Sequence, residues 1–163
     1  MSSTSTTPTA QPQIVKATLA DIERIESMIR AAFTKYIERI GKPPAPMRAD
    51  YSEIIQTHEV YVLQDKSTIQ GSIILEADDE SNTLEVGSLV VDPTAQGRGY
   101  GRTLLEFAEE RARTQGRRAL TLYTNIKMWE NLGLYRKLGF VEVGRRVQDG
   151  YERVFFEKDI SNN

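Results

Sequence analysis

The sequence lacks cysteine and has a single histidine, His58, among its 163 residues. Without thiols the chain can form no disulfide, no thiolate zinc site and no cysteine acyl-enzyme. One histidine also argues against a histidine metal cluster and against most Ser-His catalytic triads. We therefore expect no bound metal. Any chemistry must depend on Tyr, Asp, Glu, Ser and Thr side chains, on backbone groups and on a bound cofactor.

Strong charge and long apolar runs are also missing. The 21 Lys and Arg residues nearly balance 23 Asp and Glu residues, for a formal net charge of −2. We therefore expect no general attraction to nucleic acid or to an acidic membrane surface. No apolar run approaches the roughly 20 residues that span a bilayer, and the first residues resemble neither a signal peptide nor a transit peptide. These absences favour a cytoplasmic protein, with the nucleus as an alternative compartment.

The length suits one domain that can bury a full core. Residues 1–12 consist mainly of Ser, Thr, Pro and Gln, which predicts a disordered tail ahead of a folded domain at residues 13–163. The sequence leaves open whether this domain is a monomer or a homodimer.

Hydrophobic periodicity predicts alternating strands and helices along the domain. After a strand at residues 13–17, apolar residues at helical spacing predict a long helix from Thr18 to Gly41. Three prolines within residues 43–46 end this pattern. The other predicted elements are a helix at 50–56, strands at 60–64, 69–76 and 83–91, a helix at 98–115, a strand at 119–124, a helix ending at Gly139, and strands at 140–147 and 151–158.

A glycine-rich segment, Gln96-Gly97-Arg98-Gly99-Tyr100-Gly101-Arg102, joins a predicted strand to a predicted helix. The first amides of a helix lack intrahelical partners and carry about half a positive charge. Glycines at three of five positions remove side chains that would keep a phosphate away, and two arginines add charge. The segment therefore predicts a phosphate-binding loop, although its spacing matches neither a dinucleotide fold nor a P-loop.

Two segments of the sequence resemble signatures of the GNAT superfamily of N-acetyltransferases. Gln96-Gly97-Arg98-Gly99-Tyr100-Gly101 is similar to its acyl-CoA signature, and Leu134-Tyr135-Arg136-Lys137-Leu138-Gly139-Phe140 is similar to its second signature. Further segments resemble a group of small GNAT proteins, namely residues 40–47, 123–131 and 149–154. The resemblance implies an α/β fold: a mixed sheet of about seven mostly antiparallel strands, with a splayed central pair and four helices.

The resemblance also implies a function. We expect direct transfer of an acetyl group from acetyl-CoA to a primary amine, most simply that of a small molecule, without a covalent enzyme intermediate. Three alternatives are a module that senses acyl-CoA without turnover, transfer of a longer acyl group, and a protein or peptide acceptor.

The family pattern assigns residues to acetyl-CoA, position by position. Strand backbone would contact the pantetheine arm, the glycine-rich loop would hold the phosphates, and Tyr135 would protonate the departing thiolate. Asn125 and Asn131 compete for an asparagine that contacts the coenzyme A arm. The implied cofactor-binding residues are Leu89, Val90, Val91, Gln96, Gly97, Arg98, Gly99, Tyr100, Gly101, Arg102, Asn125, Asn131 and Tyr135.

The general base and the acceptor site are less directly implied. Some relatives carry a glutamate at the position of Gly87, and Glu85 lies two residues earlier on the same strand face. Glu85 could act through water or be an ordinary strand carboxylate, and His58 is expected on the remote side of the sheet. The predicted acceptor residues are Tyr36, Met47 and Tyr51 near the Pro-rich corner, and Arg145, Arg146 and Tyr151 near the last hairpin.

The two arginines suggest an acceptor with a carboxylate or phosphate, because a guanidinium can bind either group through two hydrogen bonds. The alternatives are that Tyr36, Met47 and Tyr51 are core residues, and that the arginines are solvated surface residues.

Overall fold

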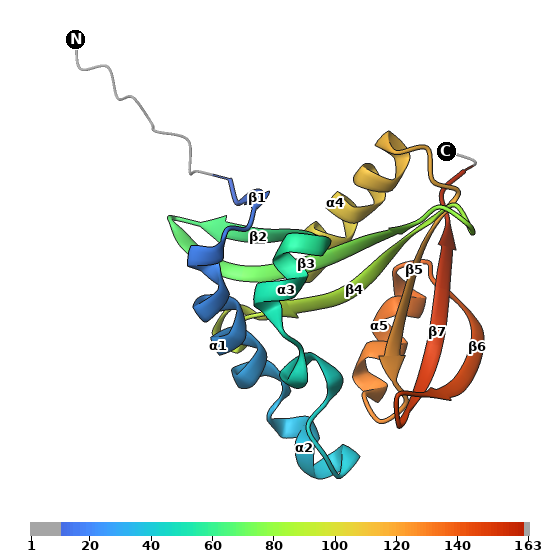
Figure 1. Cartoon of the computed structure of the whole chain (residues 1–163), viewed down its shortest axis with the longest axis horizontal. Coiled ribbons are helices and arrows are strands. Elements are labelled where there is room, and N and C mark those ends of the chain that lie inside the picture. Colours follow the sequence, from blue (N-terminus) through green and yellow to red (C-terminus); the bar gives the residue numbers. More distant parts are fainter. Residues whose placement is uncertain (1–10, 162–163) are drawn as a thin grey trace.

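The computed structural model describes residues 11–161, which form one seven-stranded sheet with helices on both faces (Figure 1). The strand order is β1-β2-β3-β4-β5-β7-β6. Among the described strands β4 and β5 are the one parallel pair, so the predicted mixed and mostly antiparallel sheet is confirmed. Residues 1–10 of the predicted tail lie outside the described residues.

The elements follow the predicted order. The strands are β1 Gln13–Lys16, β2 Glu59–Asp65, β3 Thr68–Asp78, β4 Thr83–Val91, β5 Ala119–Asn125, β6 Val141–Gln148 and β7 Tyr151–Asp159. The helices are α1 Ile22–Phe33, α2 Lys35–Ile40, α3 Tyr51–Thr57, α4 Tyr100–Thr114 and α5 Trp129–Lys137.

The long first helix predicted from the sequence is wrong in one respect, because it is divided at Thr34 into α1 and α2. The Thr34 side chain donates a hydrogen bond back to the carbonyl oxygen of Arg30. The amide of Ile37 bonds to the Thr34 carbonyl, three residues back, at 3.1 Å. Side-chain back-bonding and a tighter turn both bend a helix, so α2 takes a new direction.

Two hairpins have two-residue turns in the left-handed region. Lys66 and Ser67 connect β2 to β3 with φ of 52° and 67°, and Asp149 and Gly150 connect β6 to β7 with φ of 55° and 81°. Positive φ at both central residues gives the turn whose twist matches that of the flanking strands. The second turn fixes the register of β7, with Tyr151 opposite Gln148.

The parallel strands β4 and β5 pair over a short distance and then separate. Their register runs from Thr83 opposite Ala119 to Val86 opposite Leu122, although both strands continue beyond it. Gly87 is the extra residue of a bulge, because Val86 lies opposite Leu75 and Ser88 lies opposite Ile74. Such a bulge bends the strand. The two strands diverge into a V, with α5 beside β5 (Figure 1).

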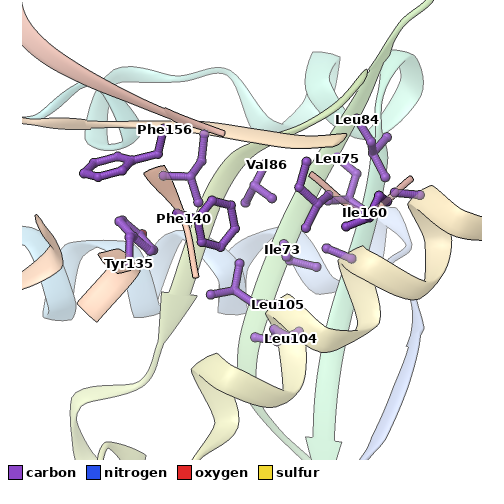
Figure 2. Packing of buried hydrophobic residues seen from close by; sticks show 14 of the residues in the cluster. Ile73, Leu75, Leu84, Val86, Leu104, Leu105, Tyr135, Phe140, Phe156 and Ile160 are labelled. Carbon is purple, nitrogen blue, oxygen red and sulfur yellow. The ribbon is translucent and has the colours of Figure 1, made fainter. Parts of the chain in front are cut away.

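Two apolar cores lie on opposite faces of the sheet. One joins the sheet to α4 and α5 and includes Leu104, Leu105 and Tyr135 (Figure 2). The other joins the sheet to α1 and α3 and includes Ile25, Met28 and Tyr51. The V-shaped opening between β4 and β5 therefore lies between the layer of α1 and α3 and the layer of α4 and α5.

Replacing Leu120, which is fully buried in β5, by alanine should lower the free energy of unfolding by about 2–5 kcal/mol. The change removes apolar contacts and leaves a cavity that the sheet cannot close. Val147→Ala on the edge strand is the control, since Val147 is 67% exposed, and it should change stability by no more than about 0.5 kcal/mol. Urea denaturation measures both, and equal effects would contradict this description of the core.

Candidate active site

The loop after β4 is anchored at Asp92. Its carboxylate accepts hydrogen bonds from the amide and hydroxyl of Thr94 at 2.9 and 2.7 Å, and it pairs with Arg24 of α1 at 2.7 Å. These bonds from Thr94, together with the Arg24 guanidinium, lower the pKa of Asp92. Arg24 also donates to the carbonyl oxygen of Ile69. The start of the glycine-rich loop is therefore tied to α1 and to β3.

The loop presents free backbone amides at the start of α4. Gly97 and Gly99 have φ of 87° and 80°, and the first backbone bond of the helix runs from the Thr103 amide to the Gly99 carbonyl at 3.0 Å. Within residues 11–161, the amides of residues 100–102 donate to no backbone carbonyl. A Cβ at Gly97 or Gly99 would meet no atom within 4 Å. Open space and unpaired amides suit a phosphate.

A cavity of about 410 Å³ extends from this loop along the end of β4. The Tyr100 hydroxyl donates to Asp65 on the far side of the loop, so the loop amide of Tyr100, not its ring, is available. Arg98 and Asn125 do not line this cavity. The predicted cofactor residues that line it are Leu89, Val90, Val91, Gln96, Gly97, Gly99, Tyr100, Gly101, Arg102, Asn131 and Tyr135.

A second cavity of about 270 Å³ lies between the separated strands β4 and β5 and the Pro-rich corner. Its polar lining includes Glu85, Glu76, His58 and Arg153. Pro44, Pro46 and Tyr51 supply much of its apolar wall. The two cavities adjoin, since both are lined by Phe33, Leu89, Asn131 and Tyr135.

Tyr135 lies at the junction of the two cavities. Its ring packs against Phe140 and Phe156, each with a centroid distance of 5.9 Å (Figure 2). Burial raises the pKa of Tyr135 to about 12, with a smaller contribution from Tyr36. No group in residues 11–161 forms a hydrogen bond with its hydroxyl. The phenol therefore stays protonated at neutral pH and is available to a ligand.

Asn131, and not Asn125, contributes to both cavities. The Asn131 amide donates to the Thr124 hydroxyl at 3.4 Å, one helical turn before Tyr135. The Asn125 side chain instead accepts from the Lys127 amide at 2.8 Å and holds the turn before α5. Of the two asparagines predicted from the sequence, the geometry favours Asn131 as a ligand-binding residue.

The carboxyl group of Glu85 is half-buried on the second cavity, beside Gly87. Burial raises its pKa, and the nearby carboxylate of Glu76 raises it further. His58 was expected on the remote side of the sheet, and this prediction is wrong. Its Nε2 lies 3.0 Å from Glu76, and both residues line the same cavity as Glu85, because the turn after α3 brings His58 to the sheet.

The predicted acceptor residues divide into two sets. Tyr51 and Tyr151 line the second cavity, with hydroxyls that donate to the carbonyls of Pro46 and Pro43 at 2.6 Å each. Tyr36 instead lines the first cavity, and Met47 packs in the core beside α1. The remaining two, Arg145 and Arg146, also lie away from the second cavity.

Arg145 pairs with Glu142 on the surface, and Arg146 lies over the ring of Phe155 at 3.7 Å. Side chains alternate between the two faces of a strand. Arg145 therefore faces the side opposite to Arg153, whereas Arg146 lies directly opposite Arg153 and shares its face. Because β6 is the edge strand and β7 lies beside β5, it is Arg153 that reaches the second cavity. Period-2 alternation on β7 could have identified Arg153 from the sequence, since Tyr151 and Arg153 share a face.

Arg39 links α2 to α5 beside the first cavity, which the sequence did not indicate. It pairs with Glu130 at 2.8 Å and lies over the ring of Trp129 at 4.0 Å and that of Tyr36 at 5.0 Å. These contacts join α2 to the helix that carries Tyr135.

Within residues 11–161 no cluster of three or more His, Cys, Asp or Glu side chains is arranged to hold a metal ion. In the same part of the chain, no helix is both long and apolar enough to cross a membrane.

Residues 56–142 match the family model described as Acetyltransferase (GNAT) domain, and the chain belongs to this family. It is 39% identical over 83 residues to an IAA acetyltransferase of Azospirillum brasilense, covering 51% of this chain and 54% of that protein. It is 36% identical over 90 residues to a mycothiol acetyltransferase of Jonesia denitrificans, covering 55% of this chain and 29% of that protein. The chain thus spans about half the length, or less, of these curated relatives.

The fold is similar to that of many solved structures. One is the PaiA N-acetyltransferase from Thermoplasma acidophilum in complex with coenzyme A, with a TM-score of 0.75 and 22% identity. The alignment covers 93% of this chain and 100% of that one. This likeness confirms the predicted GNAT fold.

Asp92→Asn should lower the free energy of unfolding at pH 7 by about 1–2 kcal/mol, because charged hydrogen bonds to Thr94 and Arg24 become neutral. The folded-state pKa of Asp92 is lowered, so its contribution is complete above its ordinary pKa of about 4 and is lost as the pH falls. Urea denaturation should show the difference between wild type and variant shrinking from pH 5 to pH 3.5.

Asp79→Asn is the matched control, since Asp79 is 91% exposed in its pair with Arg117. It should change stability little at any of these pH values. A difference for Asp92→Asn that stays constant or grows toward low pH would contradict the role assigned to Asp92.

Proposed function

We propose that this protein transfers an acetyl group from acetyl-CoA directly to the amine of a small molecule. The observation that carries the proposal is the pair of adjoining cavities that meet at Leu89, Asn131 and Tyr135. One extends to free loop amides, as a phosphate-bearing donor needs, and the other ends among titratable groups. Two cavities meeting at a protonated phenol suit a reaction between two substrates.

Residues of the first cavity would hold acetyl-CoA. The amides of residues 100–102 and the Arg102 side chain bind the pyrophosphate, and the edge of β4 that β5 leaves unpaired bonds to the pantetheine arm. Acetyl-CoA supplies a thioester whose carbonyl carbon an amine can attack. Backbone amides fixed beside that carbonyl would stabilise the charge that develops on its oxygen.

Two side chains would handle protons. Tyr135 keeps its proton at neutral pH and donates it to the departing thiolate. Glu85 receives the proton of the amine, directly or through water, and its raised pKa brings it closer to the operating pH of a general base. The attack forms a carbon–nitrogen bond while the carbon–sulfur bond breaks, so the thiol and the amide are the products.

The size of the second cavity supports a small acceptor. Its volume of about 270 Å³ lies just below the range of about 300–1,000 Å³ that is typical of small-molecule sites. The name of one relative, the mycothiol acetyltransferase, also specifies a small molecule. Release of free thiol from acetyl-CoA in the presence of amines, amino acids, aminoglycosides and peptides tests the proposal. Binding of acetyl-CoA without release in any mixture would instead favour a sensing module.

Gly99→Val should weaken binding of coenzyme A by at least tenfold, measured by titration calorimetry. A β-branched side chain at φ of 80° strains the loop and occupies the open space beside the amides. Gly116→Val is the matched control, because Gly116 also has a positive φ, 71°, and open space, but lies after the far end of α4. Unchanged affinity in a folded Gly99→Val variant would contradict the phosphate site.

Tyr135→Phe should lower kcat about 100-fold and leave the affinity for acetyl-CoA nearly unchanged. The ring packing against Phe140 and Phe156 is kept, while the proton donor is lost. Tyr61→Phe is the control, since the Tyr61 hydroxyl bonds to Glu59 away from both cavities. Steady-state kinetics with a good acceptor measures the change, and turnover at the wild-type rate would remove Tyr135 from the mechanism.

A further inference from the structure

A buried guanidinium on β7 has no role in the chemistry described so far. Arg153 is 6% exposed, lies opposite Asn125 of β5, and lines the second cavity. An arginine keeps its charge at any physiological pH, and burying a charge is costly unless it is paired. The position of Arg153 therefore calls for an anionic partner.

The partners that the chain provides satisfy part of this side chain. Nη1 donates to Gln148 Oε1 at 2.8 Å and lies 3.5 Å from Asp149, whose side chain is 79% exposed. The guanidinium carbon is 4.3 Å from the ring centre of Tyr123. Among residues 11–161, no group accepts a hydrogen bond from Nε or Nη2. Stacking on Tyr123 thus holds the group in place while two of its nitrogens remain free.

Those free nitrogens are accessible from the acceptor side. Neither nitrogen is fully buried. Among the described residues, the one fully buried side-chain nitrogen or oxygen atom without a hydrogen-bond partner is Nε of Arg111. Arg153, Glu85 and Tyr123 also line a third cavity of about 390 Å³, which adjoins the second. A small molecule beside Glu85 can therefore reach the guanidinium.

We propose that Arg153 binds a carboxylate of the acceptor, and that the acceptor is an amino acid with an apolar side chain. This inference rests on the proposed function, because it identifies the substrate of the same site. The amine would lie toward Glu85 and Tyr135, and the side chain would pack on Phe33, Pro44, Pro46 and Ile54. A guanidinium recognises a carboxylate through two parallel hydrogen bonds, and Nε with Nη2 forms such a pair of donors.

The charges of the cavity favour this acceptor over a polyamine. Glu76, which would attract a second ammonium group, lies 3.0 Å from Nε2 of His58. The fixed positive charge of Arg153 would repel that ammonium group. Glu85 is then the one carboxylate that can bind an amine, and Arg153 binds a carboxylate. This pair of groups matches a molecule with one amine and one carboxylate.

The experiment compares acceptors that differ in the carboxylate alone. Thiol release from acetyl-CoA is measured with L-phenylalanine and L-leucine, and with 2-phenylethylamine and isoamylamine, which lack the carboxylate. Arg153→Gln should lower kcat/KM for the amino acids by roughly 10- to 100-fold and leave the two amines within about threefold of wild type. Arg145→Gln, on the neighbouring strand and away from the second and third cavities, should change neither class.

Arg153→Lys tests the recognition without removing the charge. A lysine lacks the planar pair of donors, so amino-acid kcat/KM should stay below wild type. Thermal unfolding identifies any variant that fails to fold. The test needs only one of the two variants, Arg153→Gln or Arg153→Lys, to be folded. Equal use of amino acids and amines by wild type, a preference for polyamines, or unchanged amino-acid kinetics in folded Arg153→Gln would each overturn the proposal.

A binding experiment distinguishes failure of this inference from failure of the proposed function. If no amine releases thiol, L-phenylalanine is titrated by calorimetry into the protein saturated with coenzyme A. Binding to wild type that Arg153→Gln abolishes would support the carboxylate site without catalysis, and absence of binding to wild type would overturn it.

Discussion

The separation of β4 from β5 is the constraint on which the site depends. Beyond Val86 and Leu122 the two strands no longer pair, so backbone groups in the middle of a sheet lose their partners. Buried backbone groups must be satisfied, and such an edge is normally avoided or covered. Here the bulge at Gly87 bends β4 away while β3 still pairs with its other edge. The opening thus leaves one edge of β4 unpaired by β5, and in the proposed function this edge bonds to the pantetheine arm.

Contacts between segments that are distant in sequence bridge the open end of this V. On one side Arg39 of α2 pairs with Glu130 of α5, and on the other Lys42 donates to the carbonyl of Gly150 at 2.7 Å. The Tyr151 hydroxyl bonds to Pro43, which adds a link from β7 to the Pro-rich corner. Each link is small in energy, and three of them together keep the α1–α3 layer over the opening without filling it.

The sequence predicted the elements and the loop well because both depend on local patterns. Hydrophobic periodicity places β4 with its observed bounds, and glycine spacing identifies the start of α4 within two residues. The proposed cofactor side of the site follows one strand, loop and helix, so residues that are neighbours in the sequence remain neighbours in space. The proposed acceptor side gathers residues from α3, β3, β4, β5 and β7, which are distant from one another in the sequence. Register excludes Arg145, which faces the other side of the sheet, but Arg146 shares a face with Arg153. The order of the strands, with β7 between β5 and the edge strand β6, places Arg153 and not Arg146 on the second cavity.

Burial has the same effect on the pKa of the proposed acid and of the proposed base. The same low-polarity surroundings that raise the pKa of Tyr135 also raise that of Glu85, and in both cases removal from water disfavours the anion. In the proposed mechanism, this shift keeps Tyr135 protonated as the donor and makes Glu85 a stronger proton acceptor. Low polarity also strengthens every remaining charge interaction. A single guanidinium in such a cavity therefore discriminates more sharply between ligands than the surface arginines Arg145 and Arg146 could, because solvent weakens interactions on the exposed side of the hairpin.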